Sequence, residues 1–174
     1  MRIAALDIGG TSIKSGIWDG EGTAELKEQD TNAKLGGPYV MERALEILKG
    51  YGSFDAIGIS TAGQVDWEQG SIRYANENIP GYTGMQIRQI LEKEFSVPVA
   101  VENDVNAAAQ GEGIFGAGKG AESFLCLTYG TGVGGAIVMN GEVYRGSCFS
   151  AGEFGAMVMH PEDVKEGGSL QRLL

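Results

Sequence analysis

Two short stretches of the sequence end an apolar run in a glycine-rich turn, an arrangement that suits phosphate binding. In the first, A-A-L-D-I-G-G-T-S-I-K (residues 4–14), the run leads to Asp7 and then to Gly9, Gly10 and Thr11. Glycine lets a ligand approach the main chain, and successive N–H groups in such a turn form an anion-binding concavity. Asp7 could accept hydrogen bonds from the turn itself, but we prefer a metal role, because a polyphosphate needs a divalent cation.

The second stretch is L-T-Y-G-T-G-V-G-G (127–135), in which Gly130, Gly132 and Gly135 match the G-x-G-x-x-G pattern of dinucleotide-binding folds. That pattern requires a helix next, whereas A-I-V-M-N-G-E-V predicts a strand and a hairpin. The P-loop pattern, G-x-x-x-x-G-K followed by Ser or Thr, does not occur. A single glycine hairpin would be an ordinary tight turn, but two of matching layout favour a pair of phosphate-binding turns.

A third candidate is Asp104, which follows the apolar run S-V-P-V-A-V and the pair Glu102-Asn103. A carboxylate within hydrogen-bond reach of a hydroxyl can take its proton as general base. Asp is also a common helix N-cap, and D-V-N-A-A-A-Q predicts a helix here. The residues alone leave these two interpretations evenly balanced.

The elements that must position these residues follow from apolar periodicity and turn signals. A polar, glycine-dotted loop is expected over 61–82, with Thr83 capping the next helix. Strands are predicted over 2–8, 11–19, 23–31 (an edge strand), 54–61, 96–103, 124–129, 134–139 and 142–146, and helices over 39–50, 84–95 and from 104 onward.

An internal repeat suggests two related halves. A strand, a glycine turn, a second strand and an Asp-Gly or Asn-Gly pair recur with the same offset, since 130 − 9 and 141 − 20 both equal 121. We therefore expect one domain over 1–116 and the start of a second, incomplete domain over 117–174.

Composition limits the class of protein. The formal net charge of −10 argues against nucleic-acid binding, which normally uses a basic patch. The two cysteines cannot form a disulfide framework. Neither a signal peptide nor a run of about 20 apolar residues is present, so we expect a cytoplasmic protein without membrane contact.

Taken together, the motifs resemble the ROK family of sugar kinases and repressors, and the zinc-free kinases acting on glucose or β-glucosides are the most similar. The matching stretches are D-x-G-G-T-x-x-K (7–14), S-T-A-G-Q-V-D (60–66), E-N-D-V-N-A-A-A (102–109), G-T-G-V-G-G (130–135) and A-G-E-F-G (151–155). The resemblance implies an α/β fold of the actin-like ATPase (ribonuclease H-like) type, with a mixed sheet flanked by helices and two related domains. It also implies ATP-dependent phosphorylation of the 6-hydroxyl of a hexose.

The resemblance further implies roles for single residues. Asp104 would be the general base, and Mg²⁺ would lie near Asp7, directly or through water. For Lys14 we prefer a surface role on a strand to a phosphate contact. The ATP phosphates would lie between the two turns, contacting Gly9, Gly10, Thr11, Lys14, Gly130, Thr131 and Gly132. The sugar would contact Gly63, Asn78, Asn103, Asp104 and Glu153.

The chain departs from the family pattern in two respects. Ala156 stands where many members carry a histidine, and no cysteine follows Cys148, so no zinc site can be built; His160, the only histidine, is expected to be structural. The chain is also shorter than family kinases, so we expect weak or no turnover from 174 residues alone and a homodimer at full length.

Several alternatives remain open at this point. A non-catalytic sugar sensor of the same family is the main one; a DNA-binding regulator and a chaperone-like ATPase are disfavoured. The sequence does not choose among glucose, N-acetylmannosamine and β-glucosides.

Overall fold

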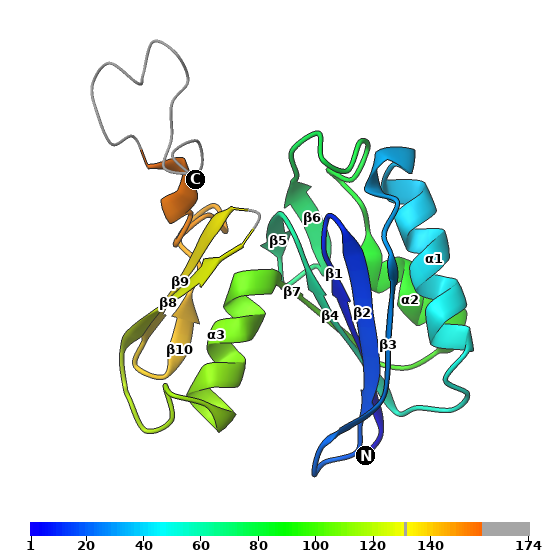
Figure 1. Ribbon diagram of the computed structural model, residues 1–174, viewed down its shortest axis with the longest axis horizontal. Coiled ribbons are helices and arrows are strands. Elements are labelled where there is room, and N and C mark those ends of the chain that lie inside the picture. The colour runs from blue at the N-terminus through cyan, green and yellow to red at the C-terminus, as the bar shows by residue number, and fades with distance from the viewer. Residues whose placement is uncertain (131, 158–174) are drawn as a thin grey trace. The chain divides into compact units, whose positions relative to one another are not determined.

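The computed structural model describes residues 1–130 and 132–157 (Figure 1). Its contacts divide the chain into two compact units, Met1–Asp104 and Val105–Leu174. The elements in chain order are β1 (Ile3–Ile8), β2 (Ser12–Trp18), β3 (Thr23–Asp30), η1 (Ala33–Leu35), α1 (Gly37–Lys49), β4 (Ala56–Thr61), β5 (Gln64–Asp66), β6 (Ser71–Tyr74), α2 (Ile87–Phe95), β7 (Val99–Asn103), α3 (Asp104–Phe115), β8 (Phe124–Tyr129), β9 (Val133–Met139), β10 (Glu142–Tyr144) and η2 (Phe154–Ala156).

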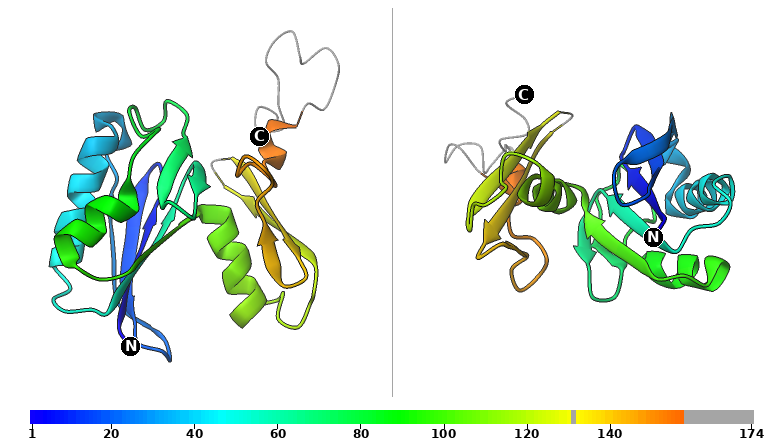
Figure 2. Two further views of the ribbon diagram at one scale, coloured as in Figure 1. Left: turned by 180° about the vertical axis from the view of Figure 1, so that it is seen from behind. Right: turned by 90° about the horizontal axis from the view of Figure 1, so that it is seen from below.

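The first unit is built on a mixed five-stranded sheet with the order β3-β2-β1-β4-β7. Strand β1 pairs antiparallel with β2 and parallel with β4, and β4 pairs parallel with β7. Helices α1 and α2 lie on the same face of this sheet (Figure 2). The predicted mixed sheet with flanking helices is thus confirmed, and the polar strand β3 lies at an edge as expected.

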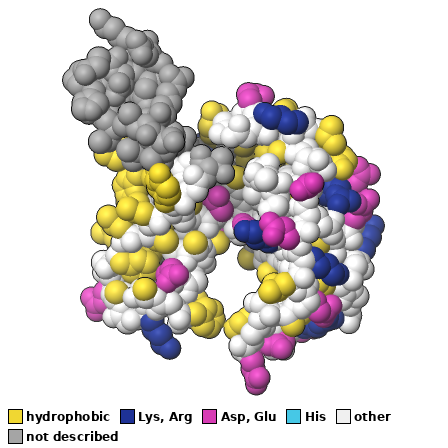
Figure 3. Space-filling view, viewed as in Figure 1, with side chains coloured by type: hydrophobic (Ala, Val, Ile, Leu, Met, Phe, Trp, Pro, Cys, Tyr) yellow, Lys and Arg dark blue, Asp and Glu magenta, His cyan; other side chains and the backbone are white. Residues whose placement is uncertain are grey.

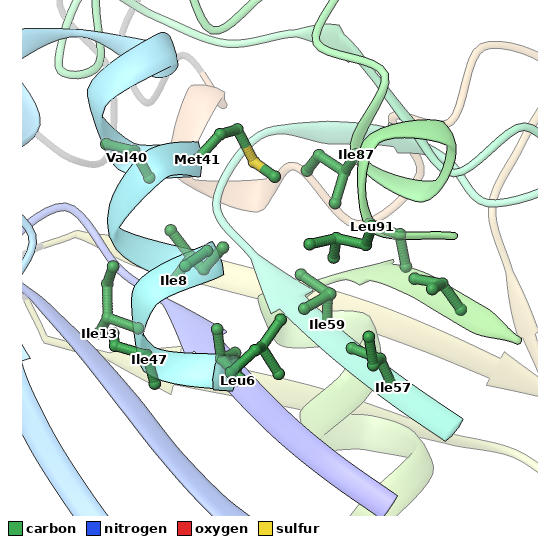
Figure 4. Packing of buried hydrophobic residues seen from close by; sticks show 14 of the residues in the cluster. Leu6, Ile8, Ile13, Val40, Met41, Ile47, Ile57, Ile59, Ile87 and Leu91 are labelled. Atoms are coloured by element: carbon green, nitrogen blue, oxygen red, sulfur yellow. The ribbon is translucent and has the colours of Figure 1, made fainter. Parts of the chain in front are cut away.

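The core of the first unit forms because alternate residues of each strand point toward the two helices. Leu6 and Ile8 of β1 and Ile57 and Ile59 of β4 are buried against one apolar side of each helix (Figure 4). The helical contribution comes from Val40, Met41, Ala44, Ile47 and Leu48 of α1 and from Ile87 and Leu91 of α2. The opposite residues of the strands, Asp7 and Ser60 among them, are only half-buried.

The second unit has an antiparallel sheet with the order β10-β9-β8, and helix α3 packs on it. Val105 and Ala109 of α3 share a buried cluster with Ala136, Val138 and Val143. These contacts place the division at Asp104–Val105, so that α3 groups with the second unit. The domain boundary at residue 116, which follows from the internal repeat, stays a prediction.

Two local predictions for the segment between β4 and α2 are wrong. Residues 61–82 are not all loop, because β5 and β6 pair as a short hairpin that buries Val65 and Ile72. Thr83 does not cap α2, which begins at Ile87. The Thr83 hydroxyl instead accepts a hydrogen bond from the Ala75 N–H (3.0 Å) and donates one to the Ala75 carbonyl (3.2 Å).

Across residues 1–130 and 132–157, every helix is too short or too polar to cross a lipid bilayer.

Candidate active site

The bend between β1 and β2 is closed by its own backbone and braced from β3. The Gly9 N–H donates to the Ser12 carbonyl at 3.0 Å. Just past β3, the Thr31 hydroxyl donates to the Gly9 carbonyl at 2.7 Å, and the Thr31 N–H donates to the Thr11 carbonyl at 2.9 Å. The Gly9 N–H is therefore used inside the bend, and any phosphate contact falls to the next residues.

Gly10 and Thr11 lie on the open side of this bend. Both are exposed, and a Cβ placed on Gly10 would meet no atom within 4 Å. A Cβ on Gly9 would lie 3.1 Å from the Ser12 carbonyl oxygen. The surface over Gly10 and Thr11 therefore has room for an anionic group that approaches the main chain, which is the fit that a phosphate requires.

Asp7 is the penultimate residue of β1, and a neighbouring strand fixes its carboxylate. The Ser60 hydroxyl on β4 donates to Asp7 Oδ1 at 2.7 Å. Lys14 is the register partner of Asp7 on β2 and is exposed. The described part of the chain holds no group of three or more His, Cys, Asp or Glu side chains that could bind a metal. Mg²⁺ commonly binds through one or two carboxylates together with phosphates and waters, so Asp7 fits a cation that arrives with a nucleotide.

The structure brings together three of the five predicted sugar contacts within the first unit. Asn103 Nδ2 donates to the Gly63 carbonyl at 3.0 Å and to Asp104 Oδ1 at 2.9 Å. The Asn103 N–H donates to Glu102 Oε1 at 2.9 Å. Asp104 is the first residue of α3 and directly follows β7, so a strand and a helix both fix its backbone.

The hairpin β5–β6 shapes the same region. Gly63 has a φ of +102°, and a Cβ there would lie 2.9 Å from the Tyr74 carbonyl oxygen, so only glycine fits without strain. Asn78 follows β6 in an exposed turn, where its N–H donates to Asn76 Oδ1 at 3.0 Å. In the sequence, Gly63 therefore directly precedes the β5–β6 hairpin and the predicted contact Asn78 follows it.

The second unit carries the other glycine bend. The Gly130 N–H donates to the Gly132 carbonyl at 3.0 Å, and the predicted contact Thr131 lies outside the described residues. This bend spans residues 130–132 between the paired residues Tyr129 and Val133, whereas the first spans 9–12 between Ile8 and Ile13. The second bend therefore has one residue fewer than the first, although the sequence repeat keeps the same offset of 121 before and after it.

The remaining glycines of this motif pack rather than bind. A Cβ on Gly135 would overlap the Phe154 ring and lie 2.6 Å from the Gly152 carbonyl oxygen. A Cβ on Gly134 would lie 2.5 Å from Val105 Cγ2 of α3. The G-V-G-G and A-G-E-F-G motifs thus meet within the second unit, and they leave the side chain of Glu153 exposed.

Sequence reasoning missed three features of the site. These are the brace from Thr31, the Ser60–Asp7 hydrogen bond and the packing role of Gly134 and Gly135. Adjacent glycines inside a strand are a signal of close backbone approach on both faces, and they could have indicated the packing role. No local pattern marks Thr31.

Comparison with known proteins gives concordant results. The ROK family model matches residues 3–168. An uncharacterised protein of Clostridium perfringens is 46% identical over 98% of this chain and 59% of its own length. A β-glucoside kinase of Listeria monocytogenes is 38% identical over 90% of this chain and 53% of its own length.

Among solved structures, a ROK family glucokinase from Streptomyces griseus, in complex with glucose and AMPPNP, superposes with a TM-score of 0.82 at 32% identity. The match covers 92% of this chain and 52% of that one, so this chain spans little more than half the length of the relatives it matches. The predicted fold, that of the actin-like ROK sugar kinases, is confirmed. The chain belongs to the ROK family.

Proposed function

We propose that the protein containing this chain transfers the γ-phosphoryl group of ATP to the 6-hydroxyl of a hexose, with Asp104 as general base. The family match and the relatives named as β-glucoside kinase and glucokinase support sugar phosphorylation. The glucose and AMPPNP bound in the Streptomyces griseus relative support the substrate pair.

The observation that carries the proposal is the environment of Asp104. Its Oδ1 accepts a hydrogen bond from Asn103 Nδ2, which is itself anchored on the Gly63 carbonyl. A fixed carboxylate can face a sugar hydroxyl in one geometry, and such orientation lowers the barrier to reaction. As the bond from the hydroxyl oxygen to the γ-phosphorus forms and the bond to ADP breaks, Asp104 takes the hydroxyl proton.

In this proposal the two bends bind the phosphates of ATP. Gly10 and Thr11 offer the open side of the first bend, and Gly130, Thr131 and Gly132 form the second. Asp7 would hold Mg²⁺ directly or through water, and Mg²⁺ would neutralise charge on the phosphates. Gly63, Asn78, Asn103 and Glu153 would orient the sugar, and Lys14 would remain a surface residue of β2.

The test uses the natural protein that contains this sequence, because the relatives are longer. ATP turnover is measured with glucose, N-acetylmannosamine and a β-glucoside, and the product is assigned by ³¹P NMR. We expect a 6-phosphate from at least one sugar. Asp104→Asn should lower kcat about 10²–10⁴-fold while the sugar Kd stays within a few-fold.

Asp55→Asn is the matched control. Asp55 precedes β4 and so lies at the opposite end of that strand from the proposed site, with Oδ2 accepting from the Arg2 N–H. Near-normal turnover in Asp104→Asn would reject the base assignment, and phosphate on another hydroxyl would reject the 6-position. Sugar binding without any phosphate transfer would favour the non-catalytic sensor.

A further inference from the structure

The Ser60 hydroxyl occupies a distinctive position in the first unit. Ser60 and Asp7 are register partners on the parallel strands β4 and β1, so their side chains leave the same face of the sheet. The hydroxyl donates to Asp7 Oδ1 at 2.7 Å, and both residues are half-buried. This bond links two regular strands within one sheet, which makes its geometry rigid.

Ser60 and its neighbour Thr61 point to opposite faces of β4, and their hydroxyls have different hydrogen-bond partners. Thr61 points into the core, where it is fully buried and its hydroxyl is 2.9 Å from the Tyr82 hydroxyl. Ser60 points to the opposite face, which carries Asp7. The hydroxyl of Ser60 is therefore bonded to the Asp7 carboxylate and not to a core residue.

The register also connects Asp7 with the strand that leads to the proposed base. Ser60 pairs with Glu102 of β7, two residues before Asp104. A serine hydroxyl has one proton to donate, and here it goes to Asp7 and not to Glu102. Glu102 Oε1 accepts from the Asn103 N–H instead. Ser60 therefore lies between two carboxylates and orients only one of them.

We propose that Ser60 is a positioning residue for the metal-bearing carboxylate of Asp7. This inference rests on the proposed function. By holding Oδ1, Ser60 fixes the carboxylate plane and directs Oδ2 toward the cation or its water shell. Hydrogen-bond partners of this kind orient metal ligands, and their loss typically lowers metal affinity about 10–100-fold.

The test measures nucleotide binding rather than turnover. AMPPNP affinity of the natural protein is determined by calorimetry in EDTA and with Mn²⁺, and the ratio of the two Kd values gives the metal-dependent gain. Ser60→Ala should reduce this gain about 10-fold and leave the Kd in EDTA unchanged. Ser60→Thr, which keeps a hydroxyl and suits a strand, should restore most of it.

Ser15→Ala is the matched control, because it removes another serine side-chain hydrogen bond of the same sheet, that of 2.8 Å with the Tyr51 hydroxyl, away from the bend. It should leave the gain unchanged. A double-mutant cycle adds a second readout: in an Asp7→Asn background, Ser60→Ala should have no further effect on the gain.

Two results would overturn the inference. One is a full metal-dependent gain in Ser60→Ala; the other is an equal loss of affinity with and without Mn²⁺, which would mark a purely structural role. A wild-type protein that shows no metal-dependent gain would instead refute the metal role of Asp7, and the Ser60 role would fall with it.

Discussion

Both units contain a three-stranded antiparallel meander, β1–β3 in the first and β8–β10 in the second, but they bury it differently. In the first unit, Leu6 of β1 is 2% exposed beneath α1 and α2. Its counterpart in the second unit at the offset of 121 is Leu127 of β8, which is 63% exposed. The neighbours Leu125 and Tyr129 are exposed as well, and hydrophobic side chains gather over β8–β10 in the space-filling view (Figure 3).

This difference shows that one strand pattern can serve two environments. Within the described residues, α3 covers the face of β8 that bears Phe124 and Cys126, whereas the first unit buries the face that bears Leu6 and Ile8. The bends differ too, because Asp7 heads the first and Thr128, its counterpart, heads the second. Only the first bend therefore carries a carboxylate for a cation.

The largest expected effect comes from truncating the two matched leucines. Leu6→Ala should destabilise the first unit by about 2–5 kcal/mol, because it leaves a cavity beneath the helices. Leu127→Ala should change stability by no more than about 0.5 kcal/mol, since the side chain is largely exposed. Urea denaturation measures both: tryptophan fluorescence reports the first unit, which holds Trp18 and Trp67, the only two tryptophans, and circular dichroism reports both units. A loss in Leu127→Ala as large as that in Leu6→Ala would mean that the β8 face is covered in solution.

The second effect is a pH dependence confined to the first unit. Burial raises the pKa of Tyr82 to about 12, against an opposing hydrogen bond from Thr61. Below pH 10 the tyrosine is protonated in both states; between pH 10 and 12 the unfolded state loses the proton and the folded state keeps it. Stability should therefore fall over this range, by roughly 2–3 kcal/mol.

Tyr82→Phe isolates this contribution from that of lysines titrating in the same range. The urea midpoint by tryptophan fluorescence is compared between pH 8 and 11.5 for the two proteins. The wild type should lose more stability than the variant as the pH rises. Parallel curves would contradict the raised pKa.

The smallest expected effect is the difference in stability between substituting Gly135, which packs within the second unit, and substituting Gly10, which lies in the first bend. Gly135→Ala forces a Cβ against Phe154 and Gly152 and should cost about 1–3 kcal/mol in the second unit. Gly10→Ala meets open space and should stay within about 0.5 kcal/mol. Hydrogen exchange of peptides from each unit gives the local stabilities. Equal protection of the second unit in Gly135→Ala and wild type would refute the packing role.

Much of the fold could be predicted because its signals are local. Apolar runs that end in glycine gave β1, β2 and β8, and the Asn140-Gly141 pair gave the β9–β10 turn, with positive φ at both residues. The hairpin β5–β6 escaped because its strands are short and polar, with one buried residue each, Val65 and Ile72. The burial of these two side chains in the core of the first unit, rather than a local sequence pattern, stabilises the hairpin.

The candidate site likewise contains some features that the sequence predicts and others that it does not. The motif resemblance predicts the grouping of Gly63, Asn103 and Asp104, and in the structure hydrogen bonds from Asn103 connect these three residues. The Ser60–Asp7 and Thr31–Gly9 bonds depend on strand register and on where β3 ends. Strand register and strand ends are properties of the assembled sheet, so no local sequence pattern predicts these two hydrogen bonds.

The proposed function requires that one nucleotide contacts both bends, residues 9–12 in the first unit and residues 130–132 in the second. Hydrogen–deuterium exchange of the natural protein, with and without AMPPNP and Mg²⁺, tests it most directly. The account predicts that peptides covering both bends gain protection at the same nucleotide concentration. Protection of one bend while the other exchanges as in the free protein would contradict it.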